Sequence, residues 1–122
     1  MGSYLPSKVM TNDEWAEIIE TSDEWITNKT GIKTRRIAPR DACTSDLALE
    51  ASRGAMRQAS VSREDLDLIV LATSSPDVPM SSTAAILQNK LGAVNAGAFD
   101  VMAVCSGWVH ALDVGARYTV DP

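Results

Sequence analysis

Apolar runs typical of strands alternate with apolar positions at helical spacing along this chain of 122 residues. The run Leu68–Ala72 is continuously apolar and partly β-branched, which is typical of a strand buried on both faces. Residues 98–103 form a second run of this kind. Residues 32–37 alternate loosely and predict a short strand or an extended loop, and residues 2–6 resemble the end of a strand running into a turn.

Helix signals fill the stretches between these runs. Thr11 and Glu14 form a capping-box pattern that predicts a helix to about residue 20, with Trp15 in the core. A second helix begins after Ser22 and must stop near Gly31, because glycine adopts the left-handed backbone of a helix end. Further helices are expected over residues 44–59, 82–91 and 108–119. Ser81 or Ser82 caps the second of these three, and Gly92 closes it.

The order of elements predicts the fold class. Strands and helices alternate, so we expect an α/β fold with a mainly parallel sheet and helices on both faces, as one domain over residues 1–122. The helix over residues 44–59 carries small residues at helical spacing, which let a helix lie close against a neighbour. The expected inward stripe is Ala48, Ala51 or Ser52, Ala55 and Ala59, with Leu47 and Met56 beside it.

Composition excludes several classes of protein. With 45% hydrophobic and 22% charged residues, the chain has the make-up of an ordinary globular domain. Two cysteines and one histidine are too few for a disulfide scaffold or a structural zinc site. No segment approaches the roughly 18 apolar residues that span a membrane, and no export signal is visible, so a reducing compartment is expected. A net charge of −5 argues against nucleic-acid binding.

The charges are nevertheless segregated. Six acidic residues between positions 13 and 24 are followed by five basic residues between positions 29 and 40. A solvated charged face and a local site for an anionic ligand group both fit this pattern.

Cys105 is the residue most suggestive of chemistry. It lies where the second apolar run turns into a helix, followed by Ser106 and Gly107. A nucleophile at such a turn is exposed beside the backbone N–H groups of the helix start, which favour a thiolate and can hold an oxyanion. The alternative is a small buried hydrophobe, the usual state of a free cysteine. Cys43, in a polar loop, is interpreted as an incidental thiol.

Five short motifs occur in order along the chain, and the segment Thr-Ser-Asp-Glu-Trp-Ile is the most specific of them. They are residues 2–6, 21–26, 30–32, 98–100 and 105–107. Together they resemble β-ketoacyl-acyl-carrier-protein synthase III, a condensing enzyme of the thiolase superfamily, over essentially the whole chain. The resemblance implies a thiolase-like layered fold, of which this chain is an incomplete amino-terminal half.

The resemblance also implies roles for particular residues. Cys105 matches the nucleophile that takes an acyl group from acyl-CoA. Trp25 matches the aromatic residue that stacks on the adenine of coenzyme A, and Thr21 matches a neighbouring contact. Lys29 stands where the family has an arginine, so it keeps the charge without the planar stacking. Met80 matches the residue that reaches across a dimer to limit the partner's acyl pocket.

The implied activity is acyl transfer from acyl-CoA to Cys105, followed by decarboxylative condensation with malonyl-acyl-carrier protein in the initiation of fatty acid synthesis. The resemblance further implies a cytoplasmic homodimer, with acyl-CoA as substrate and no metal or other cofactor. The family's catalytic histidine and asparagine lie outside these residues, so this segment alone is expected to be inactive. His110 is turned away from Cys105, and helix packing is expected for both His110 and Trp108. Two alternatives stay open: an acyltransferase of a polyketide or other secondary pathway, and a non-catalytic lobe that acts only in assembly.

Overall fold

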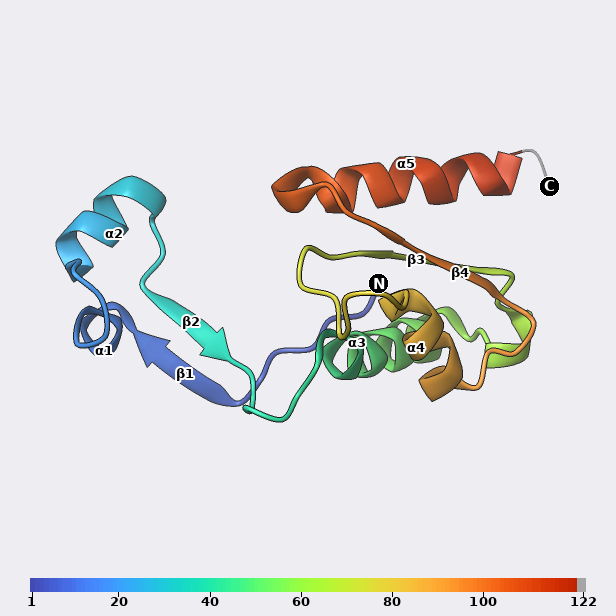
Figure 1. Ribbon diagram of the computed structural model, residues 1–122, viewed down its shortest axis with the longest axis horizontal. Coiled ribbons are helices and arrows are strands. Elements are labelled where there is room, and N and C mark those ends of the chain that lie inside the picture. Colours follow the sequence, from blue (N-terminus) through green and yellow to red (C-terminus); the bar gives the residue numbers. More distant parts are fainter. Residues whose placement is uncertain (121–122) are drawn as a thin grey trace. The chain divides into compact units, whose positions relative to one another are not determined.

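A computed structural model describes residues 1–120, in which two compact units are distinguished (Figure 1). One unit comprises residues 5–42, and the other comprises residues 1–4 together with the chain from Cys43 onward. The assignment of residues 1–122 to a single domain stays a prediction.

The unit of residues 5–42 contains one antiparallel strand pair and two helices. Lys8 lies opposite Ile37 and Thr11 opposite Thr34 in the pair. The elements are β1 (Lys8–Thr11), α1 (Asn12–Ala16), α2 (Asp23–Thr30) and β2 (Thr34–Ile37).

Local signals set both helix starts in this unit. The Glu14 N–H donates to Thr11 Oγ1 at 3.2 Å, and the Thr11 N–H donates to Glu14 Oε2 at 2.7 Å, so the expected capping box is present. The helix nevertheless ends at Ala16 and not near residue 20, because Ile18 and Ile19 are 62% and 47% exposed and bury little apolar surface. The second helix is confirmed, ending at Gly31 with φ +72°.

A buried amide holds this unit together. Asn12 is 1% exposed, and its Nδ2 donates to Asp23 Oδ1 at 2.7 Å and to the Ile32 carbonyl at 2.8 Å. Arg35 donates to Asn12 Oδ1 and lies 5.6 Å over the ring of Trp15. The expectation of Trp15 as core is therefore only half met, since the ring is half-buried beneath a guanidinium.

The second unit is built on a parallel strand pair. Leu68 lies opposite Gly97 and Ala72 opposite Val101. Figure 1 shows helices α3 and α4 on one side of this pair and α5 on the other, which confirms the predicted α/β class with helices on both faces. The elements are α3 (Thr44–Ala59), β3 (Leu68–Ala72), α4 (Thr83–Leu91), β4 (Gly97–Val101) and α5 (Gly107–Val120), with 3-10 turns at Arg63–Asp65 and Val104–Ser106.

Several boundaries differ from expectation. Residues 2–6 form no strand, and β4 stops at Val101 because the chain turns before Cys105. Within β3 only Leu71 is buried, at 8% exposure, where burial of the whole strand was expected. Ala59 is exposed and so does not belong to the inward stripe of α3.

The backbone at Gly2 packs closely against the small residues of this α3 stripe. A Cβ atom added to Gly2 would lie 2.2 Å from both the Ala51 carbonyl oxygen and the Ala55 nitrogen. Only a residue without a side chain fits there, so the small residues of α3 accommodate the chain end at Gly2.

A carboxylate ties α4 to β4. Asp100 accepts hydrogen bonds from the Thr83 and Ala84 N–H groups, each at 2.7 Å, and from Ser82 Oγ at 3.1 Å. The negative charge lies at the positive end of α4 and satisfies N–H groups that lack a partner within the helix. The start of α4 is therefore fixed to the strand that leads to Cys105.

Candidate active site

Cys105 lies in the 3-10 turn Val104–Ser106 that joins β4 to α5. The thiol is exposed, so the alternative of a buried hydrophobe is wrong. The carbonyl of Ala103 accepts from the Ser106 N–H at 3.1 Å and from Ser106 Oγ at 2.8 Å, which closes the turn around Cys105. The strand–turn–helix placement predicted for this cysteine is confirmed.

The residue before the cysteine has an unusual backbone. Val104 has φ +46°, a left-handed conformation that costs a β-branched residue about 1 to 2 kcal/mol. Its side chain is 73% exposed, so no burial of that side chain compensates the cost. The turn that presents the thiol is strained, and such strain is often found at functional sites.

The residue that opens α5 fixes the other side of the turn. Gly107 is buried, and a Cβ atom added to it would lie 3.3 Å from Ala72 Cβ at the end of β3. The first turn of α5 therefore lies directly on the sheet. Its positive end is next to Cys105, where it favours negative charge.

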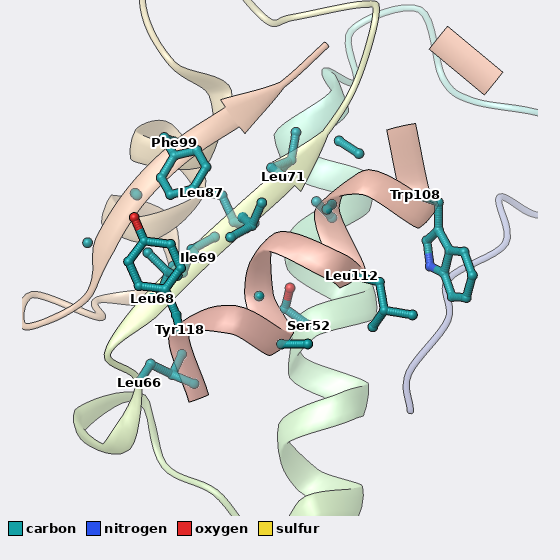
Figure 2. A pocket seen from close by; sticks show the side chains of 18 of the residues that line it. Ser52, Leu66, Leu68, Ile69, Leu71, Leu87, Phe99, Trp108, Leu112 and Tyr118 are labelled. Atoms are coloured by element: carbon teal, nitrogen blue, oxygen red, sulfur yellow. The ribbon is translucent and has the colours of Figure 1, made fainter. Parts of the chain in front are cut away.

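Cys105 and Trp108 are among the residues that line an open cavity of about 1810 Å³ between α3, β3, β4 and α5. Figure 2 shows Leu68, Ile69 and Leu71 of β3 among its lining, with Trp108, Leu112 and Tyr118 along α5. Small-molecule pockets usually enclose about 300 to 1,000 Å³, so this open space is larger than a pocket for one small molecule.

Helix packing is a wrong expectation for two residues of α5. Trp108 is 69% exposed and lines the cavity, and His110 is exposed as well. Trp108 faces that cavity, whereas His110 is not among the residues that line it.

The residues expected to contact coenzyme A lie on or beside α2, in the unit of residues 5–42. Trp25 is 58% exposed, and Lys29 follows it by one helical turn on the same face. Thr21 is half-buried just before Ser22, whose Oγ accepts from the Trp25 N–H at 3.1 Å and starts the helix. The structure therefore places an exposed aromatic residue and a lysine on the same face of α2.

Two arginines of the basic run donate hydrogen bonds to backbone carbonyl groups. Arg35 donates to the Thr11 carbonyl at 3.0 Å as well as to Asn12, and Arg36 donates to the Pro6 carbonyl at 3.1 Å. Their guanidinium groups hold the strand pair together, and the local site for an anionic ligand group stays a prediction.

Met80 is 96% exposed, in the segment of residues 73–82 between β3 and α4, which we call the Met80 loop. It does not line the cavity that holds Cys105. Cys43, the other thiol, is exposed at the start of α3.

Sequence reasoning missed the polar contacts around the Met80 loop. Ser45, at 0% exposure, donates both its N–H and its hydroxyl to the carboxylate of Asp77. Lys90 Nζ donates to Ser45 Oγ at 2.7 Å and to Asp46 Oδ1 at 2.5 Å, and this contact lowers the pKa of the Asp46 carboxyl. The available signal was a serine at the start of a helix, which identifies a helix end without indicating a partner 32 residues away.

Comparison with curated proteins decides the family. The chain is 55% identical over 117 residues to the β-ketoacyl-acyl-carrier-protein synthase III of Xylella fastidiosa strain 9a5c, covering 96% of this chain. It is 50% identical over 117 residues to the enzyme of the same name from Caldanaerobacter subterraneus. The chain belongs to the β-ketoacyl-acyl-carrier-protein synthase III family. It spans about a third of these relatives, 36% and 35% of their lengths.

Solved structures place the fold in the same family of condensing enzymes. The 3-oxoacyl-acyl-carrier-protein synthase III of Aquifex aeolicus superimposes with a TM-score of 0.90 at 46% identity, over 97% of this chain and 38% of that one. The priming β-ketosynthase of the R1128 polyketide pathway superimposes with a TM-score of 0.89 at 38% identity, over 95% of this chain and 35% of that one. The thiolase-like layered fold is thereby confirmed.

No protein-family model matches the chain. Among residues 1–120 no helix is both long and apolar enough to cross a membrane. Within the same residues, no three His, Cys, Asp or Glu side chains come together in the way a metal site requires.

Proposed function

We propose that this chain provides the acyl-accepting cysteine of a cytoplasmic β-ketoacyl-acyl-carrier-protein synthase III. The observation that carries this proposal is the exposed thiol of Cys105 on the strained turn before α5, in a chain of this family. The relatives are about three times as long, so the activity is proposed for the complete enzyme.

The first step is a thioester exchange. The Cys105 sulfur attacks the carbonyl carbon of acyl-CoA, the new C–S bond forms, and the bond to the CoA sulfur breaks. CoA leaves as its thiol and takes up the proton that Cys105 releases. Backbone N–H groups at the start of α5 stabilise the developing oxyanion, and the helix end favours the attacking thiolate. Decarboxylative condensation with malonyl-acyl-carrier protein follows. Its catalytic histidine and asparagine belong to the part of the complete enzyme outside these 122 residues.

Coenzyme A is held at α2 in this proposal. The exposed ring of Trp25 stacks on the adenine, Lys29 attracts the nucleotide phosphates, and Thr21 lies beside them. The exposed ring and the i, i+4 spacing of Trp25 and Lys29 support this assignment. No cofactor beyond the CoA substrate is needed.

Met80 extends in this proposal from one protomer of a homodimer and limits the acyl pocket of the other. Its 96% exposure supports a role in contact with a second chain, because a methionine this exposed stabilises its own fold little.

Selective acylation tests the central role of Cys105. The complete enzyme is incubated with acetyl-CoA, or with iodoacetamide at low concentration, and digested peptides are quantified by mass spectrometry. Cys105 should be modified at least tenfold faster than Cys43, which serves as an internal control because it is also exposed. Equal rates, or faster modification of Cys43, would refute the assignment.

A second candidate is a priming ketosynthase of polyketide synthesis. The 38% identity and TM-score of 0.89 to the R1128 enzyme favour it. This enzyme would use the same Cys105 chemistry with another carrier protein. Turnover with a fatty-acid-type carrier protein and with a polyketide carrier protein distinguishes the two candidates.

A further inference from the structure

The Met80 loop is held by polar contacts at several points and contains no regular secondary structure. The Thr44 hydroxyl donates to the Ser75 carbonyl at 2.6 Å, and Ser82 at the other end donates to Asp100 at 3.1 Å. Met80 and Val78 are 96% and 42% exposed, so their apolar side chains do little to fix the loop.

Asp77 is the central contact. Its Oδ1 accepts from the Ser45 N–H at 3.0 Å, and its Oδ2 accepts from the Ser45 hydroxyl. Its own N–H donates to Thr83 Oγ1 at 3.1 Å. Ser45 and Thr83 are both at 0% exposure. One residue thus joins the loop to the first turn of α3 and to the first turn of α4.

Lys90 of α4 supports the contact between Asp77 and Ser45 of α3. Lys90 lies 2.7 Å from Ser45 Oγ and donates to it, so the hydroxyl passes its own hydrogen to Asp77. Hydrogen bonds to an ionised acceptor are shorter and stronger than neutral ones, and buried donors that lose their acceptor are costly. The loop therefore has one strongly preferred conformation, in which Met80 is three residues from a fixed anchor.

We propose that Asp77 is a positioning residue that holds the Met80 loop in one conformation and thereby sets the acyl-chain preference at the pocket that Met80 limits. The second half of this statement rests on the proposed function of Met80. The first half concerns this chain alone and is tested separately.

The chain offers a matched control for the first half. Asp46 also lies in the first turn of α3, where it accepts from the Cys43 N–H at 2.9 Å and from Lys90 at 2.5 Å, without contacting the Met80 loop. Asp77→Ala and Asp46→Ala both weaken the start of α3, but only Asp77→Ala releases the loop. Asp77→Asn retains an acceptor for the Ser45 N–H and should therefore keep part of the contact between the Met80 loop and α3.

Hydrogen exchange of the 122-residue variants, with ¹³C-methyl relaxation of Met80, provides the first measurement. Asp77→Ala should accelerate amide exchange over residues 73–82 at least tenfold and increase the mobility of the Met80 methyl group, and Asp77→Asn should do so less. Asp46→Ala should leave the amide exchange of the Met80 loop and the mobility of the Met80 methyl group unchanged, although it lowers the melting temperature about as much as Asp77→Ala does. Equal acceleration in Asp46→Ala, or none in Asp77→Ala, overturns the positioning role.

Acyl preference provides the second measurement, in a chimera that joins this chain to the remaining two thirds of the Xylella fastidiosa relative. Asp77→Ala should change the ratio of kcat/KM for acetyl-CoA to that for hexanoyl-CoA at least threefold, and Asp46→Ala should not. If Asp77→Ala loosens the Met80 loop but leaves this ratio of kcat/KM values unchanged, Asp77 does not set the acyl-chain preference. If the chimera without substitutions transfers no acyl group, the proposed function is at fault, and hydrogen exchange decides the positioning role alone.

Discussion

Replacing Asp100 by alanine should remove a large part of the free energy that stabilises the unit of residues 1–4 and 43 onward. The substitution removes the acceptor of two backbone N–H groups, those of Thr83 and Ala84, and both residues are at 0% exposure. Each buried N–H left without a partner costs about 1 to 3 kcal/mol, and the charge at the start of α4 is lost as well. We therefore expect a loss of about 3 to 5 kcal/mol, which is large beside the roughly 5 to 15 kcal/mol that stabilise a typical domain.

Urea unfolding followed by circular dichroism at 222 nm measures this loss. With a slope of about 1 to 3 kcal/mol per molar urea, the midpoint for Asp100→Ala should fall by about 2 M. Asp100→Asn keeps one acceptor oxygen and should lose about half as much free energy. Asp67→Ala, which removes an exposed carboxylate of the same unit, should stay within about 0.5 kcal/mol of the unsubstituted chain. A loss below about 1 kcal/mol for Asp100→Ala, or one equal to that of Asp67→Ala, would refute the role given to these contacts.

Three further substitutions and one titration test other parts of the structure. Trp25→Ala in the chimera should raise the KM for acyl-CoA about 5- to 150-fold with little change in the acylation rate, because base stacking contributes about 1 to 3 kcal/mol. Unchanged CoA binding in calorimetry would refute the assignment of Trp25 to the adenine. Lys29→Arg should leave CoA affinity equal or higher in the same calorimetry, because arginine keeps the charge and adds a planar group that can stack; a weaker complex would refute the placement of residue 29 beside CoA. Val104→Gly should change the free energy of unfolding by less than about 1 kcal/mol, because glycine relieves the left-handed strain at residue 104 but also adds freedom to the unfolded chain. A larger loss in urea unfolding would show that the turn is unstrained. The hydrogen bond from Lys90 lowers the pKa of Asp46, so the stability that the Asp46 carboxylate contributes is present above about pH 4 and is lost as the pH falls further. The melting temperature of Asp46→Asn should therefore fall less steeply with decreasing pH than that of the unsubstituted chain. Parallel curves of melting temperature against pH would speak against this linkage.

Local signals account for the elements that were predicted well. Gly31 and Gly92 end their helices in left-handed backbone, each at φ +72°, and Ser82 caps α4 through its hydroxyl. These features depend on residues close in sequence, so the pattern alone identifies them. The continuous apolar run of β3 was placed at its observed bounds for the same reason.

Elements that depend on distant partners were predicted less well. The strand β1 exists because it pairs with β2, and the Arg36 side chain reaches back 30 residues to the Pro6 carbonyl. Neither contact leaves a pattern within residues 2–11. For the same reason, the sequence does not show that Arg35 and Arg36 donate to carbonyl groups distant in the chain.

The candidate site divides in the same way. The position of Cys105 between a strand and a helix followed from the apolar run and from the two small residues after it. The left-handed backbone of Val104 could not be predicted, because a β-branched residue disfavours that conformation and only the surrounding fold imposes it. The exposure of Trp108 was missed because a large apolar side chain on a helix is normally expected to pack.

The contact between Gly107 and Ala72 has a consequence for how this sequence can vary. Because an added Cβ at residue 107 would lie 3.3 Å from Ala72 Cβ, closer than the roughly 3.5 to 4.0 Å at which carbon atoms pack, the two positions share one small volume. They form a coupled pair in which a larger residue at either place lifts the first turn of α5, and with it the thiol, off the sheet. A serine or alanine at position 107 becomes compatible with an undisplaced cysteine once position 72 is glycine. Variation at position 107, directly after the turn that carries Cys105, is therefore governed by a residue 35 positions earlier in the chain.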